Sequence, residues 1–449
     1  MREFMQYITN AFYGATGWND DNTYKDLNAT AKGLIDFPLP RGLRLNLSAL
    51  ATPHFATSYQ LGTVGVVDGS ISYLHSTIPL TNIAAQSDQI PLSALLRSYR
   101  RLHGLGSRDG QWCWEAEDTA SAGATQTAAP TISPSATSAG STLLYGRLYL
   151  PQSLLEALVV RRLTPELQVQ LSAVSERSLR NGGTILGLLQ YDRGKYGIEG
   201  LFSTDGGLLG FRGLYNFGGD TSPSTSGSPA GPASSEPSGN GQSSEKERIY
   251  GRFSAGGEVY YGTLNKSGGM SLGGRFATLP AHRGTPLTAT LTINPLMGNI
   301  NATYAVLAKD YCALATRMEF NVYSYESEWA VGMELWSNRR PAGFLLGADP
   351  RNLEVIPEPE APRVKERSFQ AKLEWRLDDE EPEPSPPSPP ENHEEYRGVL
   401  KARMDQNLRV GLLWEGRAKS LIFSLGTGID LRKLDEPFRS LGLEIQYSS

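Results

Sequence analysis

The sequence predicts an all-β protein, folded as a single transmembrane β-barrel domain over residues 1–449. Apolar and polar residues alternate with a period of two along most of the chain, as they do when one face of each strand meets lipid and the other meets water. The alternating segments run for about nine to eleven residues, the length at which a tilted strand crosses a bilayer. No run of 18 apolar residues exists, so we expect no transmembrane helix.

The first element expected is a short amphipathic helix over residues 2–14, within a helical N-terminal segment 1–20. Five apolar residues there recur at the spacing of one helical face. In a barrel, such a helix would sit inside the lumen or lie along the rim. A frayed terminus is the alternative. The five residues are Phe4, Tyr7, Ile8, Ala11 and Phe12.

Strands fill most of the remaining chain. Leu43, Leu45 and Leu47 alternate with polar residues, and the alternation is most regular over 369–377. Charged residues such as Lys401 on the polar faces suit a wet lumen. Short spacers that contain Gly, Asn or Pro predict hairpin turns, and the count of strands comes to about twenty. The candidate strands are 28–37, 42–50, 55–64, 69–77, 143–150, 156–163, 166–174, 183–191, 195–204, 207–216, 249–262, 269–279, 286–294, 299–308, 311–324, 325–336, 367–378, 395–405, 408–416, 420–431 and 439–448.

Four insertions interrupt this rhythm. Residues 119–141 are rich in Ala, Thr and Ser, residues 219–244 in Ser, Pro and Gly, and residues 338–366 and 379–394 in proline and charge. None of them can bury enough apolar area to offset the entropy of ordering, so we expect disordered loops at the barrel rims. The stretch 91–103 predicts a short helix that lies on a rim.

Charge and cysteine content restrict the setting of the protein. The net charge of −5 does not favour nucleic acid as a partner. Cys113 and Cys312 are far apart and lack ligand spacing, so we expect free thiols. The first ten residues have neither the apolar core of a secretory signal nor the Arg-rich pattern of a transit peptide. These observations point to an organelle outer membrane that is reached from the cytosol.

The sequence contains little that suggests catalysis. Gly269, Ser271 and Gly273 match the spacing of a nucleophile elbow, but the elbow needs a strand, a sharp turn and a helix, and the following residues predict more strand. No two of the five histidines have the spacing of metal ligands, and no glycine-rich phosphate loop is present. We therefore predict no catalytic, cofactor-binding or metal-binding residues, and a protein that is not an enzyme.

The C-terminal segment 440–449 predicts a membrane-barrel strand. Its apolar residues fall on one face of the strand and its polar residues on the other. The order is a polar residue, Gly442 two positions later, Ile445, and then Tyr447. This order resembles the C-terminal sorting signal of mitochondrial outer-membrane barrels. The apolar face holds Leu441, Leu443, Ile445 and Tyr447, and the polar face holds Glu444 and Gln446.

Short segments spread over nearly the whole chain, outside the low-complexity loops, carry a wider resemblance. They are Phe12-Tyr13, Asn22-x-Tyr24, Ala29-Thr30-Ala31, Leu34-Ile35-Asp36-Phe37, Ser70-Ile71-Ser72-Tyr73, Tyr145-Gly146-Arg147-Leu148-Tyr149, the segment from Leu155 to Pro165, Gly284-Thr285-Pro286, Asn294-Pro295, Leu412-Leu413-Trp414-Glu415-Gly416 and the C-terminal strand. Taken in this order, they resemble the fungal mitochondrial distribution and morphology protein 10 family. The resemblance implies a barrel of the mitochondrial porin type with about 19 strands, whose odd number requires the first and last strands to pair in parallel.

The resemblance also implies a function. Members of this family have no known catalytic activity and need no cofactor. They are multi-pass anchors in the mitochondrial outer membrane, and they serve two assemblies. One is the endoplasmic reticulum–mitochondria encounter structure, which tethers the organelles, exchanges phospholipid and supports mitochondrial morphology. The other is the sorting and assembly machinery, which inserts β-barrels and helps to assemble the import translocase.

The partners that the resemblance implies are the lipid-transfer proteins of the tether, the barrel subunit of the sorting machinery with its cytosolic subunits, and outer-membrane lipids. Ser440, Gly442, Ile445 and Tyr447 match the positions of the family's sorting signal. Tyr73 matches an aromatic position where docking on the sorting machinery is plausible. A lipid-interface tyrosine is the other interpretation of Tyr73, since barrels carry aromatic girdles.

Two other classes of protein compete with the anchor. A barrel of this size encloses a lumen wide enough for water unless something blocks it, so a porin-like metabolite channel is the alternative. The N-terminal segment 2–14 is the candidate for a block. A soluble β-rich enzyme or propeller is the third class, and it would be released from mitochondria by alkaline carbonate.

Overall fold

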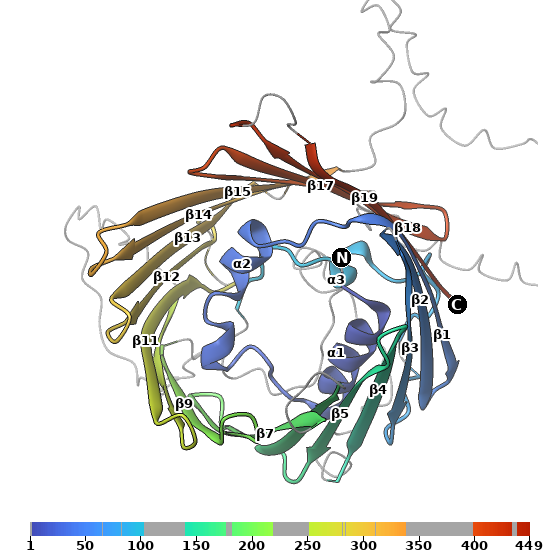
Figure 1. Ribbon diagram of the computed structural model, residues 1–449, viewed down its shortest axis with the longest axis horizontal. Coiled ribbons are helices and arrows are strands. Elements are labelled where there is room, and N and C mark those ends of the chain that lie inside the picture. The colour runs from blue at the N-terminus through green and yellow to red at the C-terminus, as the bar shows by residue number, and fades with distance from the viewer. Residues whose placement is uncertain are drawn as a thin grey trace, which may run out of the picture. The chain divides into compact units, whose positions relative to one another are not determined.

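A single sheet of 19 strands, closed on itself, makes up most of the described chain (Figure 1). The computed structural model describes residues 2–64, 66–81, 83–102, 140–176, 182–218, 251–280, 282, 284–309, 311–337, 398–432 and 438–449. The all-β barrel fold is confirmed. The strands are β1 Gly42–Thr52, β2 Phe55–Val64, β3 Val66–Ser76, β4 Thr142–Leu150, β5 Leu154–Arg162, β6 Leu167–Ser175, β7 Gly183–Asp192, β8 Tyr196–Ser203, β9 Leu208–Phe217, β10 Gly251–Gly262, β11 Ser267–Thr278, β12 Leu287–Asn294, β13 Asn299–Lys309, β14 Cys312–Asn321, β15 Ser327–Ser337, β16 Gly398–Asp405, β17 Arg409–Ala418, β18 Leu421–Asp430 and β19 Phe438–Ser448.

The barrel closes between its first and last strands. Each strand pairs antiparallel with the next one along the chain, and β1 pairs in parallel with β19, from Gly42 opposite Gly442 to Ser48 opposite Ser448. With an odd number of alternating strands, the first and the last run in the same direction, so closure has to be parallel. The implied odd closure is confirmed. We call the β1–β19 pair the seam.

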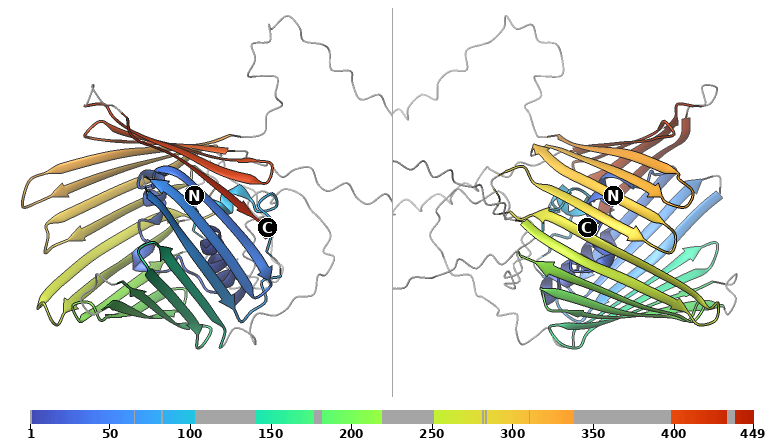
Figure 2. Two further views of the ribbon diagram at one scale, coloured as in Figure 1. Left: turned by 45° about the vertical axis from the view of Figure 1, so that its right-hand side comes forward. Right: turned by 90° about the vertical axis from the view of Figure 1, so that its left-hand side faces the viewer.

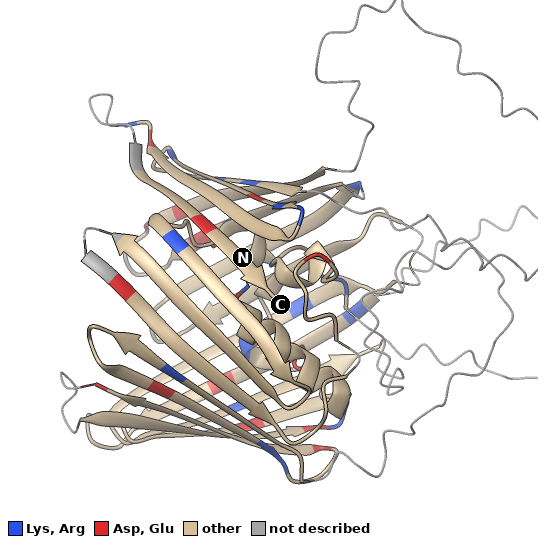
Figure 3. Ribbon diagram, turned by 90° about the vertical axis from the view of Figure 1, so that its right-hand side faces the viewer, with Lys and Arg blue, Asp and Glu red and all other residues tan. Residues whose placement is uncertain are grey.

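The two faces of the strands differ as the alternation predicts. On β1, Leu43 and Leu47 point outward and are 50% and 44% exposed, whereas Asn46 and Ser48 point into the lumen and are 5% and 6% exposed. The same contrast recurs around the wall, because outward side chains are apolar enough to meet lipid while inward ones are mostly small or polar. Charged residues are sparse along the strands (Figure 3).

The two rims of the barrel carry different connections. Links between antiparallel strands alternate between the rims. The longest gaps between described strands, β3–β4, β9–β10 and β15–β16, all fall at the rim where Ser449 lies, which we call the long-loop rim. The opposite, short-turn rim carries tight connections such as 204–207, 263–266 and 295–298. The strands run between the rims at a strong tilt (Figure 2).

Among the described residues, four short helices lie inside the ring of strands (Figure 1). They are α1 Phe4–Thr16, the 3₁₀ turn η1 Tyr24–Asp26, α2 Ala29–Ile35 and α3 Leu92–Leu95. Helix α1 ends at Gly17, whose φ of 66° is the left-handed conformation that favours glycine. The predicted N-terminal helix is confirmed, and all five of its apolar face residues are buried. No helix among the described residues has the length and apolar character needed to cross a membrane.

Two expectations from the sequence are wrong. Residues 28–37 are not a strand, because Leu27, which follows η1, and Ala31 and Leu34 of α2 recur at helical spacing and are buried on the inner side of the wall. The stretch 91–103 does contain a helix, but α3 lies inside the barrel and not on the rim, with Leu95 fully buried beside α1.

Several expectations fall outside the described residues. The candidate strand 367–378 does, and so do the expected loops 219–244, 338–366 and 379–394, and all of the loop 119–141 except its last two residues. Cys113 also lies outside, whereas Cys312 is a free thiol, as predicted. The disorder of these loops and the single-domain organisation of the whole chain therefore stay predictions. The other nineteen candidate strands each correspond to one strand of the barrel.

Candidate functional site

The C-terminal strand β19 holds the four residues that match the sorting signal, and it forms one side of the seam. Gly442 is buried on the lumen face, and Ser440 shares that face. Ile445 and Tyr447 point outward, where Ile445 lies opposite Leu45 and Tyr447 is 38% exposed. The predicted division of the two faces of this strand is confirmed. The four residues thus form two inward and two outward positions of one closing strand.

Gly442 has a local physical reason to be glycine. A side chain at this position would meet the backbone of Pro40 and Arg41, which crosses the lumen face of β19 just before β1 begins. The N-terminal segment therefore passes over the inner side of the seam before it joins the sheet. Only a residue without a Cβ allows this close approach without shifting the backbone.

Tyr73 lies on the outer wall, on β3, close to the long-loop rim. Its side chain is 46% exposed, and its ring stacks on Phe55 with centroids 5.9 Å apart and planes 16° apart. Tyr59, on β2, is similarly exposed at 47%. These outward aromatic rings can contact either interfacial lipid or a membrane-embedded partner, and both interpretations of Tyr73 remain compatible with its position.

An apolar cluster fills part of the lumen towards the long-loop rim. Phe4, Ile8 and Phe12 of α1 are 1%, 0% and 0% exposed. They belong to the same cluster as inward-facing wall residues such as Leu74 and Leu143, together with α3. An open aqueous pore would leave these wall positions polar, so the apolar lining is matched to the helices that cover it. The lumen at this end is therefore filled by the protein's own helices.

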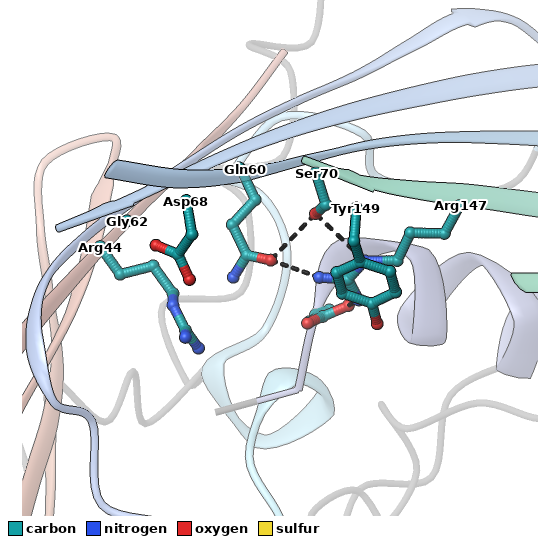
Figure 4. Close-up of a pocket in the computed structure, with 9 residues that line it drawn as sticks. Arg44, Gln60, Gly62, Asp68, Ser70, Arg147 and Tyr149 are labelled. Atoms are coloured by element: carbon teal, nitrogen blue, oxygen red, sulfur yellow. Dashed lines mark hydrogen bonds and ion pairs between the residues drawn. The ribbon is translucent and has the colours of Figure 1, made fainter. Parts of the chain in front are cut away.

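The start of α1 is attached to the wall through a polar cavity of about 240 Å³ (Figure 4). Arg147 forms an ion pair with Glu3 at 2.8 Å, and its Nε donates to the Ser70 hydroxyl at 3.1 Å. The Arg147 guanidinium also donates to the Gln60 side chain. The cavity has two arginines and two carboxylates in its lining, and so carries no excess charge. The lining residues are Glu3, Arg44, Gln60, Gly62, Asp68, Gly69, Ser70, Arg147 and Tyr149.

On another part of the wall, a buried ion pair joins β16 to β17. Lys401 Nζ lies 3.3 Å from Glu415 Oε2, and the two side chains are only 2% and 1% exposed. The same Nζ donates to the carbonyl of Arg97 at 2.6 Å, which holds the segment after α3 against the wall. The charges that the alternation places in the lumen therefore serve to hold internal segments in place.

The segment that matches the spacing of a nucleophile elbow, Gly269 to Gly273, has a structural role. Ser271 lies within the regular strand β11, so no strand–turn–helix elbow is formed. Its hydroxyl is 2.8 Å from the Tyr24 hydroxyl of η1. Among the described residues, no group of three or more His, Cys, Asp or Glu side chains is arranged to hold a metal ion. The inner wall thus offers attachment points for the N-terminal segment.

Sequence reasoning missed the importance of residues 22–41, because it assigned part of this segment to a strand. The segment runs along the inner wall from β8 to β19, and its polar side chains bond to the strands that it passes. Helical spacing at Leu27, Ala31, Leu34 and Ile35 was the signal that could have identified it. The glycines beneath it carried no recognisable signal.

The fold and this site define a class of protein: a porin-type membrane β-barrel with an odd number of strands, whose lumen is lined by its own N-terminal segment. The sequence matches the family described as mitochondrial distribution and morphology protein 10 over residues 1–449. The chain belongs to this family. Membership and the barrel fold together make it a mitochondrial membrane protein.

Individual relatives agree with this assignment. The chain is similar to mitochondrial distribution and morphology protein 10 of Chaetomium globosum, at 75% identity over 95% of this chain and 99% of the relative. It is also similar to the proteins of the same name from Podospora anserina and Neurospora crassa, each at 70% identity over the full length of both chains. The similarity extends over whole proteins and not over a shared fragment.

Proposed function

We propose that the protein is an anchor in the mitochondrial outer membrane. It serves the endoplasmic reticulum–mitochondria encounter structure, in tethering, phospholipid exchange and mitochondrial morphology. It also serves the sorting and assembly machinery, in β-barrel biogenesis and assembly of the import translocase. One observation carries the proposal: the lumen of this family member is lined by the chain's own N-terminal segment, so the outer wall and the rims are the surfaces free to act.

A barrel suits the role of anchor for physical reasons. Its backbone polar groups are satisfied within the closed sheet, so it is stable in lipid without a partner. Its wall and rims are rigid, and soluble proteins can be fixed to them at a defined place. The partners proposed are the lipid-transfer subunits of the tether, the barrel and cytosolic subunits of the sorting machinery, and the surrounding lipids. The function proposed here is that of a structural tether and not of an enzyme.

Residue roles within this function are also proposals. We assign Ser440, Gly442, Ile445 and Tyr447 to the sorting signal that the assembly machinery reads, since they lie on the strand that closes the barrel. We assign Tyr73 to a partner interface on the outer wall. Its exposure and its position near one rim support this assignment, although the same features suit an aromatic girdle.

Co-purification from mitochondria in mild detergent tests the function and the role of Tyr73 together. The affinity-tagged protein is expected to retain subunits of both assemblies. Tyr73→Ala is expected to reduce recovery of the sorting machinery and to leave the tether subunits in place. Tyr215→Ala is the matched control, because Tyr215 is an equally exposed tyrosine near the same rim, on the distant strand β9. Recovery of neither assembly with the wild-type protein would refute the anchor, and equal effects of the two variants would assign Tyr73 to the lipid girdle.

A further inference from the structure

Residues 22–41, which we call the inner strap, follow the inner wall around much of the barrel (Figure 1). Asn216 of β9 donates its side-chain Nδ2 to Asn22 Oδ1 at 2.7 Å. Further on, Arg317 of β14 forms an ion pair with Asp36 at 2.6 Å. Arg403 of β16 then donates to the carbonyl of Phe37 at 3.2 Å. The inner strap is therefore attached at successive strands by bonds that are specific in position.

Beneath the inner strap, the wall repeatedly presents glycine. A Cβ built at Gly197 of β8 would lie 2.5 Å from the Asn22 carbonyl oxygen, and one at Gly332 of β15 would lie 2.5 Å from that of Leu34. Real Cβ contacts are never this short, so any side chain would push the inner strap away from the wall. Gly273, Gly426 and Gly442 meet the inner strap in this way. These five lumen-facing glycines form a seat shaped for the inner strap.

The end of the seat lies at the seam. Pro40 rests on Gly426 of β18 and on Gly442 of β19, and the chain enters β1 two residues later at Gly42, which pairs with Gly442. In a hairpin, the turn determines the register of the two strands. The seam has no turn, because β1 and β19 are the two ends of the sheet and pair in parallel. Something else has to determine its register.

We propose that the inner strap is a fixed template that sets the register of the β1–β19 seam, with the glycine seat as its receptor. A slip of one residue would invert the faces of β1, which lipid forbids. A slip of two residues keeps the apolar side chains of β1 facing lipid and its polar side chains facing the lumen, so the alternation of the strands does not exclude it. It would bring Ser440 or Glu444 beneath Pro40 in place of Gly442, and the seat excludes both side chains. The inner strap is thus needed for β1 and β19 to pair in the correct register, and it does not act as a gate of the lumen.

A pair of variants tests the seat. In Gly426→Ala, the new Cβ would lie 2.5 Å from Pro40 Cδ, so we expect a several-fold smaller fraction of newly imported protein to show the heat-dependent gel shift of a folded barrel. Adding Pro40→Ala removes the atoms of that clash and is expected to restore assembly. Gly442→Ala meets the backbone of Pro40 and Arg41, so Pro40→Ala is expected not to restore it. Gly200→Ala is the control, because nothing lies within 4 Å of a Cβ there.

Crosslinking tests the register directly. Leu43 and Leu443 are register partners on the outer side of the seam. In a background with Cys113→Ser and Cys312→Ser, we expect Leu43→Cys to crosslink with Leu443→Cys and not with Leu441→Cys. Moving the seat glycine by two positions, with Ser440→Gly and Gly442→Ala together, is expected to shift the crosslink to Leu441→Cys, because the backbone of Pro40 and Arg41 can then lie only over residue 440.

The outcomes separate the template from other roles. Failure of Pro40→Ala to rescue Gly426→Ala would overturn the proposal that these glycines form a seat for the inner strap. An unchanged crosslink pattern after the seat glycine is moved to position 440 would overturn the role in register. Neither result depends on the two assemblies, because both readouts report closure of the barrel itself. The proposal and the anchor function can therefore fail independently.

Discussion

Lys401 and Glu415 form an ion pair 3.3 Å apart inside the barrel wall, and each side chain is almost completely buried. Neither residue meets lipid, because both point into the lumen from neighbouring strands. The lysine is also bonded to the Arg97 carbonyl, so the pair joins the wall to an internal segment. A buried charge that loses its partner is costly, and the pair is therefore a sensitive test of the packed lumen.

We expect Glu415→Gln to lower the free energy of unfolding by about 3–5 kcal/mol, because it removes one partner of a buried ion pair. Urea titration of purified protein in detergent, followed by the heat-dependent shift of folded barrels on gels, measures this. The triple variant Glu334→Leu, Lys401→Met and Glu415→Leu is expected to recover most of the loss, since it also removes Glu334, the buried carboxylate that lies opposite Lys401 on β15. A triple variant as unstable as the single one would show that these residues act through shape and not through charge.

Neighbouring residues of one strand are expected to differ in the stability cost of an introduced charge, because one faces lipid and the next faces the lumen. Leu171 lies at the middle of β6 and is 46% exposed to lipid. Leu171→Arg is expected to destabilise the barrel by about 2–4 kcal/mol, because it places a charge near the middle of the bilayer. Gln170→Arg, one residue away on the lumen face, is expected to change stability much less. The free energy of folding into lipid vesicles measures both variants, and equal losses would mean that the faces are assigned wrongly.

Helix α1 is expected to contribute to stability through its buried face. Phe12 is 0% exposed, so Phe12→Ala is expected to cost about 3–5 kcal/mol of unfolding free energy through lost burial and the cavity left behind. Gln6→Ala is the matched control on the exposed face of the same helix. Thermal unfolding followed by circular dichroism measures the two. If both variants melted like the wild type, the helix would be only loosely held in the lumen.

Conductance separates the anchor from the porin-like channel. The lumen is lined by α1, the inner strap and α3, so we expect purified protein in planar bilayers to lack the large, stable, weakly selective steps of an open porin. A mitochondrial porin reconstituted in the same bilayers is the control for the assay. Porin-like steps from the wild-type protein would favour the metabolite channel.

The sorting-signal assignment predicts a kinetic effect. Tyr447→Ala is expected to slow assembly of radiolabelled precursor in isolated mitochondria, because the final strand both signals insertion and closes the barrel. Ser449→Ala, beyond the end of β19, is expected to assemble at the normal rate. Normal kinetics for both variants would remove Tyr447 from the signal, while the position of Tyr447 in the seam would be unaffected.

Much of the barrel could be predicted from the sequence because a membrane strand has a local signature. Leu43 to Ser48 alternates so regularly that its two faces follow from period alone. Helix α1 was equally accessible, because Phe4, Ile8 and Phe12 recur at helical spacing. The error at 28–37 arose where both periods can be fitted to a short apolar segment, and only contact with the wall decided in favour of helix.

By itself, the sequence determined that the chain forms a barrel, which face of each strand meets lipid, and that the N-terminus is helical. Each of these depends on residues close together in the chain. Only the tertiary structure decided where the helices lie, why Gly426 and Gly442 have no side chain, and how Pro40 comes to rest on the seam. Those relationships join residues some four hundred positions apart, and no local periodicity records which distant backbone a glycine has to accommodate.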